Sequence, residues 1–178
     1  MKHSIRNVAL SIAVFLSMAS GMASAGVLND ATIFSIFDQA NMADITTARI
    51  GIKKAHSKEV RELAQMVVAD HEAVQHMGRE LATKLGVTPL PPDNDKSVEN
   101  LAKAIANLDG KNGAEFDKAY LLYEIGFHQS VIDAIKGALL PAIKDDQFKA
   151  LMTKVLPGFE HHLAATKVAA KKLGIQVM

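Results

Sequence analysis

The stretch AEFDKAYLLYEIGFHQSVIDAIKGALL, residues 114–140, decides the fold that the sequence predicts. Its apolar residues recur every three or four positions, which is the spacing of an α-helix with one buried face. On a helical wheel of about 100° per residue, Glu124 and His128 fall in the middle of the apolar stripe, beside Leu121. Charged groups are normally exposed, so a carboxylate and an imidazole on a buried face are informative. We expect this helix to turn polar side chains into the core.

The rest of the chain has the same periodicity and lacks the alternation typical of strands, so we predict an all-α protein. We expect four long helices over about residues 32–55, 58–85, 114–140 and 145–174, and a short one over about 97–108.

Local signals set the ends of these helices. Ser57 and Ser97 are the expected N-caps of the second long helix and of the short helix. The third long helix should stop before Pro141, because proline lacks the amide that continues a helix. Pro157 points away from the apolar face of the last helix, so we expect a bend there and not a break.

The lengths of the links predict the topology. The first and second long helices are joined by a short link, and so are the third and fourth, which predicts two antiparallel hairpins. The segment between the hairpins, Gly86–Gly113, contains the short helix and is long enough to traverse the bundle. This pattern is that of a ferritin-like four-helix bundle with a crossover, and an up-down-up-down bundle is the alternative.

The N-terminus reads as a processing signal. Lys2 and Arg6 precede an apolar run, and the small residues 23–25, Ala-Ser-Ala, follow it. This order is typical of a secretory signal peptide over residues 1–25, cleaved between Ala25 and Gly26. We therefore expect a periplasmic or secreted domain, residues 26–178, with no membrane span left after cleavage.

Composition narrows the chemistry. The chain has no cysteine, so disulfides and thiolate sites are excluded, although export would place it in an oxidising compartment. The net charge is +1 and the basic residues form no cluster, so nucleic acid is not an expected partner. Association into a homodimer is left open.

Polar residues within apolar stripes occur on all four long helices, at matching distances from the connecting loops. Side chains at one level of a helical bundle can converge on a common centre, where such proteins build metal sites. The predicted ligands are Asp44, Asp70, His71, Glu124, His128 and His162.

Three interpretations of this set remain open. Three buried carboxylates need a counter-charge, and a divalent cation would supply it. Histidine and carboxylate ligands without sulfur suit zinc, iron or manganese, and also copper. The second interpretation is a metal-free hydrogen-bond network that only sets the helix register, in a structural or stress-related interaction protein. The third is catalysis beyond binding.

Residues outside this set have simpler expected roles. Asp117 should stabilise the first turn of its helix through the helix dipole, and Tyr120 should fill the core. His76 and His161 are expected on the solvated surface, whereas Met42, Met66, Met77 and Met152 are expected to fill gaps in the core.

Several short motifs together resemble a known family across essentially the whole chain after the signal. They are Ala43-Asp44-Ile45, residues 57–61 (SKEVR), residues 66–71 (MVVADH), residues 116–120 (FDKAY) with His128, and Leu156-Pro157 with His162-Leu163. The set resembles the secreted bacterial ferritin-like family catalogued as domain of unknown function four-one-four-two. The resemblance implies a ferritin-like bundle exported to the periplasm, without an established activity.

The resemblance also bears on the predicted ligands. Asp44, Asp70, His71, His128 and His162 match motif positions of the family, whereas Glu124 rests on the wheel geometry alone. Neither the second nor the fourth long helix contains the ExxH pattern of di-iron ferritins. A ferroxidase centre is therefore not expected, and a binding protein is expected in preference to an enzyme.

Overall fold

The computed structural model describes residues 28–177, and these residues form helices and turns without a strand. The prediction of an all-α protein is confirmed. The expected signal peptide and its cleavage site lie outside the described residues. None of the described helices is long and apolar enough to cross a membrane.

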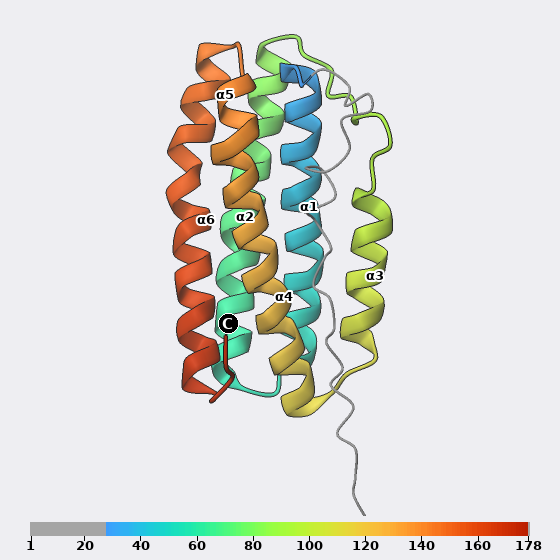
Figure 1. Cartoon of the computed structure of the whole chain (residues 1–178), viewed down its shortest axis with the longest axis vertical. Coiled ribbons are helices and arrows are strands. Elements are labelled where there is room, and N and C mark those ends of the chain that lie inside the picture. Colours follow the sequence, from blue (N-terminus) through green and yellow to red (C-terminus); the bar gives the residue numbers. More distant parts are fainter. Residues whose placement is uncertain (1–27, 178) are drawn as a thin grey trace, which may run out of the picture.

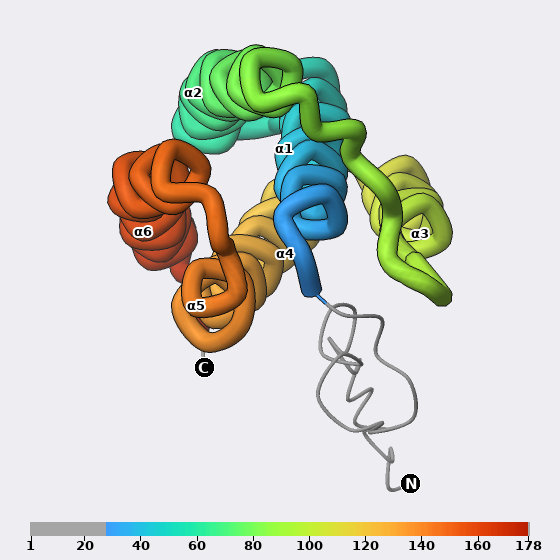
Figure 2. Tube along the Cα trace, turned by 90° about the horizontal axis from the view of Figure 1, so that it is seen from above, coloured from blue at the N-terminus to red at the C-terminus, as the bar shows by residue number. Residues whose placement is uncertain are grey.

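The helices follow one another along the chain with short and long links. They are α1 (Asp30–Lys54), α2 (Lys58–Lys84), α3 (Ser97–Asp109), α4 (Gly113–Ala134), the π-helical turn η1 (Ile135–Leu139), α5 (Leu140–Ala142) and α6 (Asp146–Lys172). The long helices α1, α2, α6 and α4 stand side by side around a common interior (Figures 1 and 2). The pairs α1–α2 and α4–α6 run antiparallel, and α3 packs outside this group against α1 and α4 (Figure 1).

The segment between α2 and α4 runs along the length of α1. Near the start of α1, the amide of Leu90 donates to the carbonyl of Ala31 at 3.1 Å. At the other end of α1, Lys54 Nζ donates to the carbonyl of Asp109 at 2.7 Å. Consequently α4 begins at the opposite end of the molecule from the point where α2 finishes (Figure 1), and the chain crosses over between the two hairpins. The up-down-up-down alternative does not describe this chain.

The helix caps follow the sequence in one case and depart from it in another. The Ser57 side chain accepts a hydrogen bond from the amide of Val60, as its predicted N-cap role requires. The prediction for Ser97 is wrong, because Ser97 is already the first helical residue. Asp95 accepts bonds from both the amide and the hydroxyl of Ser97 at 2.9 Å, so the carboxylate takes over the capping role.

The end of α4 also differs from the prediction. The chain does not stop before Pro141 but continues through η1 into α5, which contains this proline. A proline ring clashes with the carbonyl four residues earlier in a regular α-helix. The π turn directly before it widens the backbone, with the amide of Leu140 bonded to the carbonyl of Ile135, so the proline is accommodated.

Pro157 lies within α6, which is continuous from Asp146 to Lys172. The proline is exposed, so it lies on the outer face of α6 as predicted, and the helix is not broken there.

Two apolar clusters fill the interior, one toward each end of the long helices. The first gathers aromatic and aliphatic side chains that include Phe34, Phe148, Met152 and Phe159. The second includes Val60, Leu63, Phe116, Tyr120 and Leu121. Buried polar residues lie between the two clusters, so apolar material separates this polar layer from both ends of the molecule.

Two buried or half-buried aspartates tie each hairpin to the turn of the other. Asp117 of α4 accepts from the amides of His56 and Ser57, at 2.9 and 2.7 Å, in the α1–α2 turn. Asp30 of α1 accepts from the amides of Lys144 and Asp145, at 2.8 and 2.9 Å, before α6. The prediction that Asp117 acts through its own helix dipole is therefore incomplete, because its carboxylate bonds to another turn and is 3% exposed.

We predict that Asp117→Ala lowers the free energy of unfolding by about 2–4 kcal/mol, because it removes two charge-assisted bonds and leaves two amides without acceptors. The measurement is urea denaturation followed by circular dichroism. Glu115→Ala, at an exposed position of the same helix, is the control and should change stability by less than about 0.5 kcal/mol. Equal effects of the two substitutions would contradict the assignment.

Candidate metal centre

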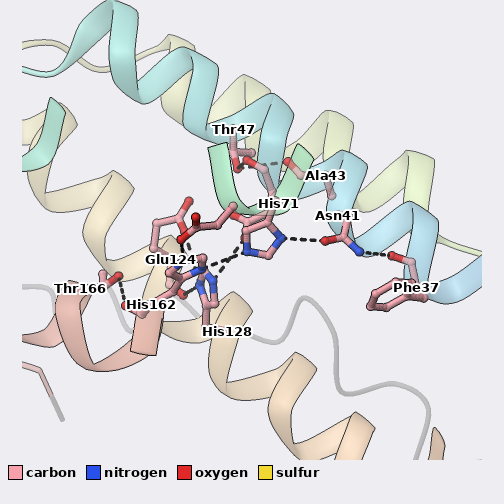
Figure 3. A network of polar contacts seen from close by, with 11 residues as sticks. Phe37, Asn41, Ala43, Thr47, His71, Glu124, His128, His162 and Thr166 are labelled. Carbon is pink, nitrogen blue, oxygen red and sulfur yellow. Dashed lines mark hydrogen bonds and ion pairs between the residues drawn. The ribbon is translucent and has the colours of Figure 1, made fainter. Parts of the chain in front are cut away.

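The polar layer brings together side chains from all four long helices. Asp44 comes from α1, His71 from α2, Glu124 and His128 from α4, and His162 from α6. Each of these residues is at most 2% exposed. Figure 3 shows the three imidazoles turned toward one another, with Glu124 beside them.

His71 is held by an amide from α1. The Asn41 side-chain amide nitrogen donates to the carbonyl of Phe37 at 2.7 Å, which directs its oxygen to His71 Nδ1 at 2.9 Å (Figure 3). That oxygen can only accept, so His71 carries a proton on Nδ1. In the neutral ring, the lone pair is then on Nε2, which faces the centre of the layer.

His128 and His162 are held in the same way by different acceptors. His128 Nδ1 lies 3.0 Å from the backbone carbonyl of Glu124, one turn earlier on α4. His162 Nε2 lies 2.9 Å from a carboxylate oxygen of Asp70. Both acceptors require a proton on the ring nitrogen that they contact. We call this nitrogen the outer one, because it points away from the centre of the layer, and the other nitrogen of each ring the inner one. The lone pairs of the two neutral rings are therefore on His128 Nε2 and His162 Nδ1.

The inner nitrogen atoms lie close to one another and to a carboxylate. His71 Nε2 is 3.1 Å from His162 Nδ1 and 2.9 Å from Asp44 Oδ2. His128 Nε2 is 3.3 Å from the same Asp44 oxygen. With neutral rings, these contacts place acceptors against acceptors. A proton or a cation is needed between them.

Six atoms of this layer are buried without a hydrogen-bond partner. They are both carboxylate oxygens of Asp44, both of Glu124, the hydroxyl of Tyr120 and Nε2 of His128. Asp44 Oδ2 is among them although it lies 2.9 Å from His71 Nε2, a contact at ion-pair distance. In the part of the chain that the structure describes, the ion pairs of Asp44 and Glu124 are formed with histidines and with no lysine or arginine. Buried polar atoms without partners are rare in proteins, so the layer lacks a counter-charge.

The pKa values of Asp44 and Glu124 are shifted in opposite directions. Burial raises the pKa of Asp44, but the nearby His71 and His128 outweigh it and bring this pKa down to about 2. Burial, reinforced by the charge of Asp44, raises the pKa of Glu124 well above its usual value. Burial also lowers the pKa of His128 and of His162, which favours the neutral form of these two rings.

The spacing of the possible ligand atoms in the polar layer resembles that of a metal site. The ligand atoms of His71, His128 and His162 all lie within 4.8 Å of one another, and so do those of Asp44, Glu124 and His128. In a tetrahedral zinc site with metal–nitrogen bonds of about 2.0–2.1 Å, neighbouring ligand atoms are about 3.3 Å apart. The 2.9–3.3 Å contacts around His71 and His128 are close to this spacing. The buried clusters could hold a metal ion.

The structure separates the predicted ligands into two kinds. Five of them, Asp44, His71, Glu124, His128 and His162, meet in the layer. Asp70 does not, because its side chain is 56% exposed and contacts the outer nitrogen of His162. Asp70 therefore lies outside the group of side chains that meet at the centre, and its hydrogen bond orients the ring of His162.

Sequence reasoning did not assign a role to Asn41, which orients His71. The signal that could have found it is its amide in the apolar stripe of α1, where it is fully buried. Tyr120 fills the core as predicted, yet its hydroxyl has no partner. Burial, together with the nearby Glu124 and Asp44, raises the pKa of Tyr120 well above its usual value. His76 and His161 are exposed, as predicted.

The four methionines that were expected to fill the core differ in burial. Met152 is fully buried, and Met66 and Met77 pack partly buried against the two apolar clusters. Met42 is 39% exposed, so the prediction that it fills a gap in the core is wrong. It adjoins Asn41 on α1 but lies on the outer side of the helix.

A family model described as Domain of unknown function (DUF4142) matches residues 16–168. This chain belongs to that family. The family inferred from the short motifs is thus confirmed. No curated protein and no solved structure matches the chain. The DUF4142 description names no activity, so a function has to be argued from the site.

We predict that diethyl pyrocarbonate modifies His76 and His161 in the folded protein and leaves His71, His128 and His162 unmodified, because only the first two are exposed. Peptide mass spectrometry after brief treatment measures the modification of each residue. All five should react in denaturing urea, which serves as the control. Rapid modification of the buried three in the native state would show that the layer is open to solvent.

Proposed function

We propose that this member of the DUF4142 family is an exported, ferritin-like four-helix bundle that binds a transition-metal ion at the centre of its interior. The binding would serve metal sequestration, metal delivery or stress protection. Export is supported by the expected signal peptide over residues 1–25, and the ferritin-like arrangement by two antiparallel hairpins joined through a crossover.

A single observation carries the proposal. All three buried histidines have their outer ring nitrogen bonded to an acceptor of the protein, so their inner nitrogens offer lone pairs to one place. Histidine ligands of metal ions are held by outer hydrogen bonds of this type. A purely structural network would be expected to place donors opposite acceptors, whereas here His128 Nε2 and both oxygens of Asp44 are buried without a hydrogen-bond partner.

The ligand set indicates the class of metal. His71, His128 and His162 supply neutral nitrogen atoms, and the ionised Asp44 adds one negative charge beside two of them. Sets rich in imidazole without sulfur suit Zn²⁺ and Cu²⁺, and also iron and manganese. A cation here would neutralise Asp44 and relieve the repulsion between facing lone pairs.

The environment suits retention of an ion. The ring of Phe159 packs edge-on to His71 at 5.0 Å between ring centroids, and apolar clusters lie on either side of the layer. Water has little access to such a site, which slows the loss of a bound ion. The same burial favours storage or transport of an ion over rapid exchange with solvent.

We predict that the untagged mature protein binds Zn²⁺ or Cu²⁺ and that removal of the metal by a chelator lowers its melting temperature by about 5–10 °C. An ion at about 100 times its dissociation constant adds about 2.7 kcal/mol, and each kcal/mol shifts the melting temperature of a protein of this size by about 2–4 °C. Elemental analysis and a calorimetric melting curve measure the two effects.

Metal contents below about a tenth of an equivalent after incubation with Zn, Cu, Fe and Mn would overturn the proposal. An unchanged melting curve with chelator, together with a neutral or stabilising His162→Leu substitution, would identify the layer as a metal-free device for helix packing.

We also predict that Asn41→Ala weakens metal binding by about 10–100-fold although it removes no ligand, because His71 loses the acceptor that orients its ring. Competition with a chromophoric chelator measures the affinity. Met42→Ala, at the exposed neighbouring position of α1, is the matched control and should bind as the wild type does. Equal affinities of both variants would show that the outer bond to His71 does not support a metal.

A further inference from the structure

The metal position proposed above lies between His71, His128 and His162, and we call it the nitrogen-rich position. It leaves part of the polar layer unexplained. Glu124 belongs with Asp44 and His128 in one group of ligand atoms, whereas His71 and His162 belong with His128 in another. An ion bound between the three imidazoles would take up the lone pairs of the rings. It would leave the carboxyl oxygens of Glu124 and one oxygen of Asp44 without a partner.

The unexplained atoms are oxygens that converge from α1 and α4. Both carboxylate oxygens of Glu124 and the hydroxyl of Tyr120 are buried without a well-formed hydrogen bond, although the hydroxyl lies near the carboxyl group, and both residues are 0% exposed. The two lie four residues apart on one face of α4, so both side chains project to the same side. Asp44 on α1 faces Glu124, since the ligand atoms of Asp44, Glu124 and His128 all lie within 4.8 Å of one another.

The surroundings supply no protein cation to this group. Glu124 pairs only with His128, at 3.4 Å, among the ion pairs that the described residues form. His128 Nδ1 already faces the backbone carbonyl of Glu124, so this nitrogen is not free to neutralise the carboxylate. Thr47, which lies near this level on α1, directs its hydroxyl to the carbonyls of Ala43 and Asp44 (Figure 3).

We propose that the layer contains a second cation position, rich in oxygen, formed by Asp44, Glu124 and the Tyr120 hydroxyl, next to the nitrogen-rich position. Asp44 belongs to both, with one carboxylate oxygen beside the imidazoles and the other available to the second ion. Oxygen ligands of this kind suit hard divalent ions, of which Mn²⁺ is the probe. This inference rests on the proposed function, because it assumes that the imidazoles hold their own ion.

The two positions differ in ligand chemistry, so they should differ in metal preference. Three imidazoles favour Zn²⁺, whereas two carboxylates and a phenol oxygen favour Mn²⁺. A protein loaded with one equivalent of Zn²⁺ should therefore bind one further equivalent of Mn²⁺ per chain without losing the zinc. Elemental analysis after gel filtration gives both stoichiometries, and electron paramagnetic resonance measures free and bound Mn²⁺.

The decisive variant is Glu124→Gln, which keeps the size of the side chain and removes its charge. It should retain one equivalent of Zn²⁺ and bind Mn²⁺ at least about tenfold more weakly. Glu160→Gln, at an exposed position of α6 paired with Lys136, is the matched control and should bind both ions as the wild type does. Tyr120→Phe removes only the hydroxyl, and it should weaken Mn²⁺ binding by a smaller factor; this variant replaces Glu124→Gln if the latter does not fold.

The outcomes separate this inference from the proposed function. One equivalent of Zn²⁺ without bound Mn²⁺, or displacement of zinc by manganese, overturns the second position and leaves the proposed function intact. Mn²⁺ binding that neither α4 variant weakens indicates surface sites and also overturns it. Failure to bind any metal overturns both proposals together.

Discussion

The outer hydrogen bonds of the three buried histidines constrain everything else in the polar layer. Asn41, the backbone carbonyl of Glu124 and the carboxylate of Asp70 each accept a hydrogen bond from one ring. Because each neutral imidazole has a single proton on nitrogen, this leaves the inner nitrogens as acceptors. The three acceptors are a side-chain amide, a backbone carbonyl and a carboxylate. Although they differ in kind, each one holds a proton on the outer nitrogen of its histidine.

This arrangement needs accurate register between helices, and the two hairpins supply it reciprocally. Asp117 of the second hairpin bonds to the α1–α2 turn, and Asp30 of the first bonds to the turn before α6. The two contacts lie at opposite ends of the molecule and hold each turn by two backbone amides. Close packing has the same effect, since a Cβ atom at Gly51 would lie 2.9 Å from the ring of Tyr120. The level at which the side chains meet is thus set from both ends.

Several features of the site were accessible from periodicity, and others were not. The helical wheel placed Glu124, His128 and His162 on buried faces, and the structure has all three in the interior. The periodicity of α2 left both Asp70 and His71 as predicted ligands, and it could not tell which side chain would turn inward. The rotation of α2 against α6 decides this, so His71 faces the centre and Asp70 remains half exposed. The capping rule failed at Ser97, because the carboxylate of Asp95 bonds to this residue. The proline rule failed at Pro141, because a π turn before it accommodates the ring.

The sequence by itself determined that the protein is helical, where the long helices lie and which family the chain belongs to, because hydrophobic period and short motifs are local properties of the chain. Only the tertiary structure decided which polar groups meet, which nitrogen of each ring faces the centre and which oxygens remain without partners. These properties depend on helix rotation and on contacts between residues far apart in the chain, such as His162 with Asp70, and no local pattern encodes them.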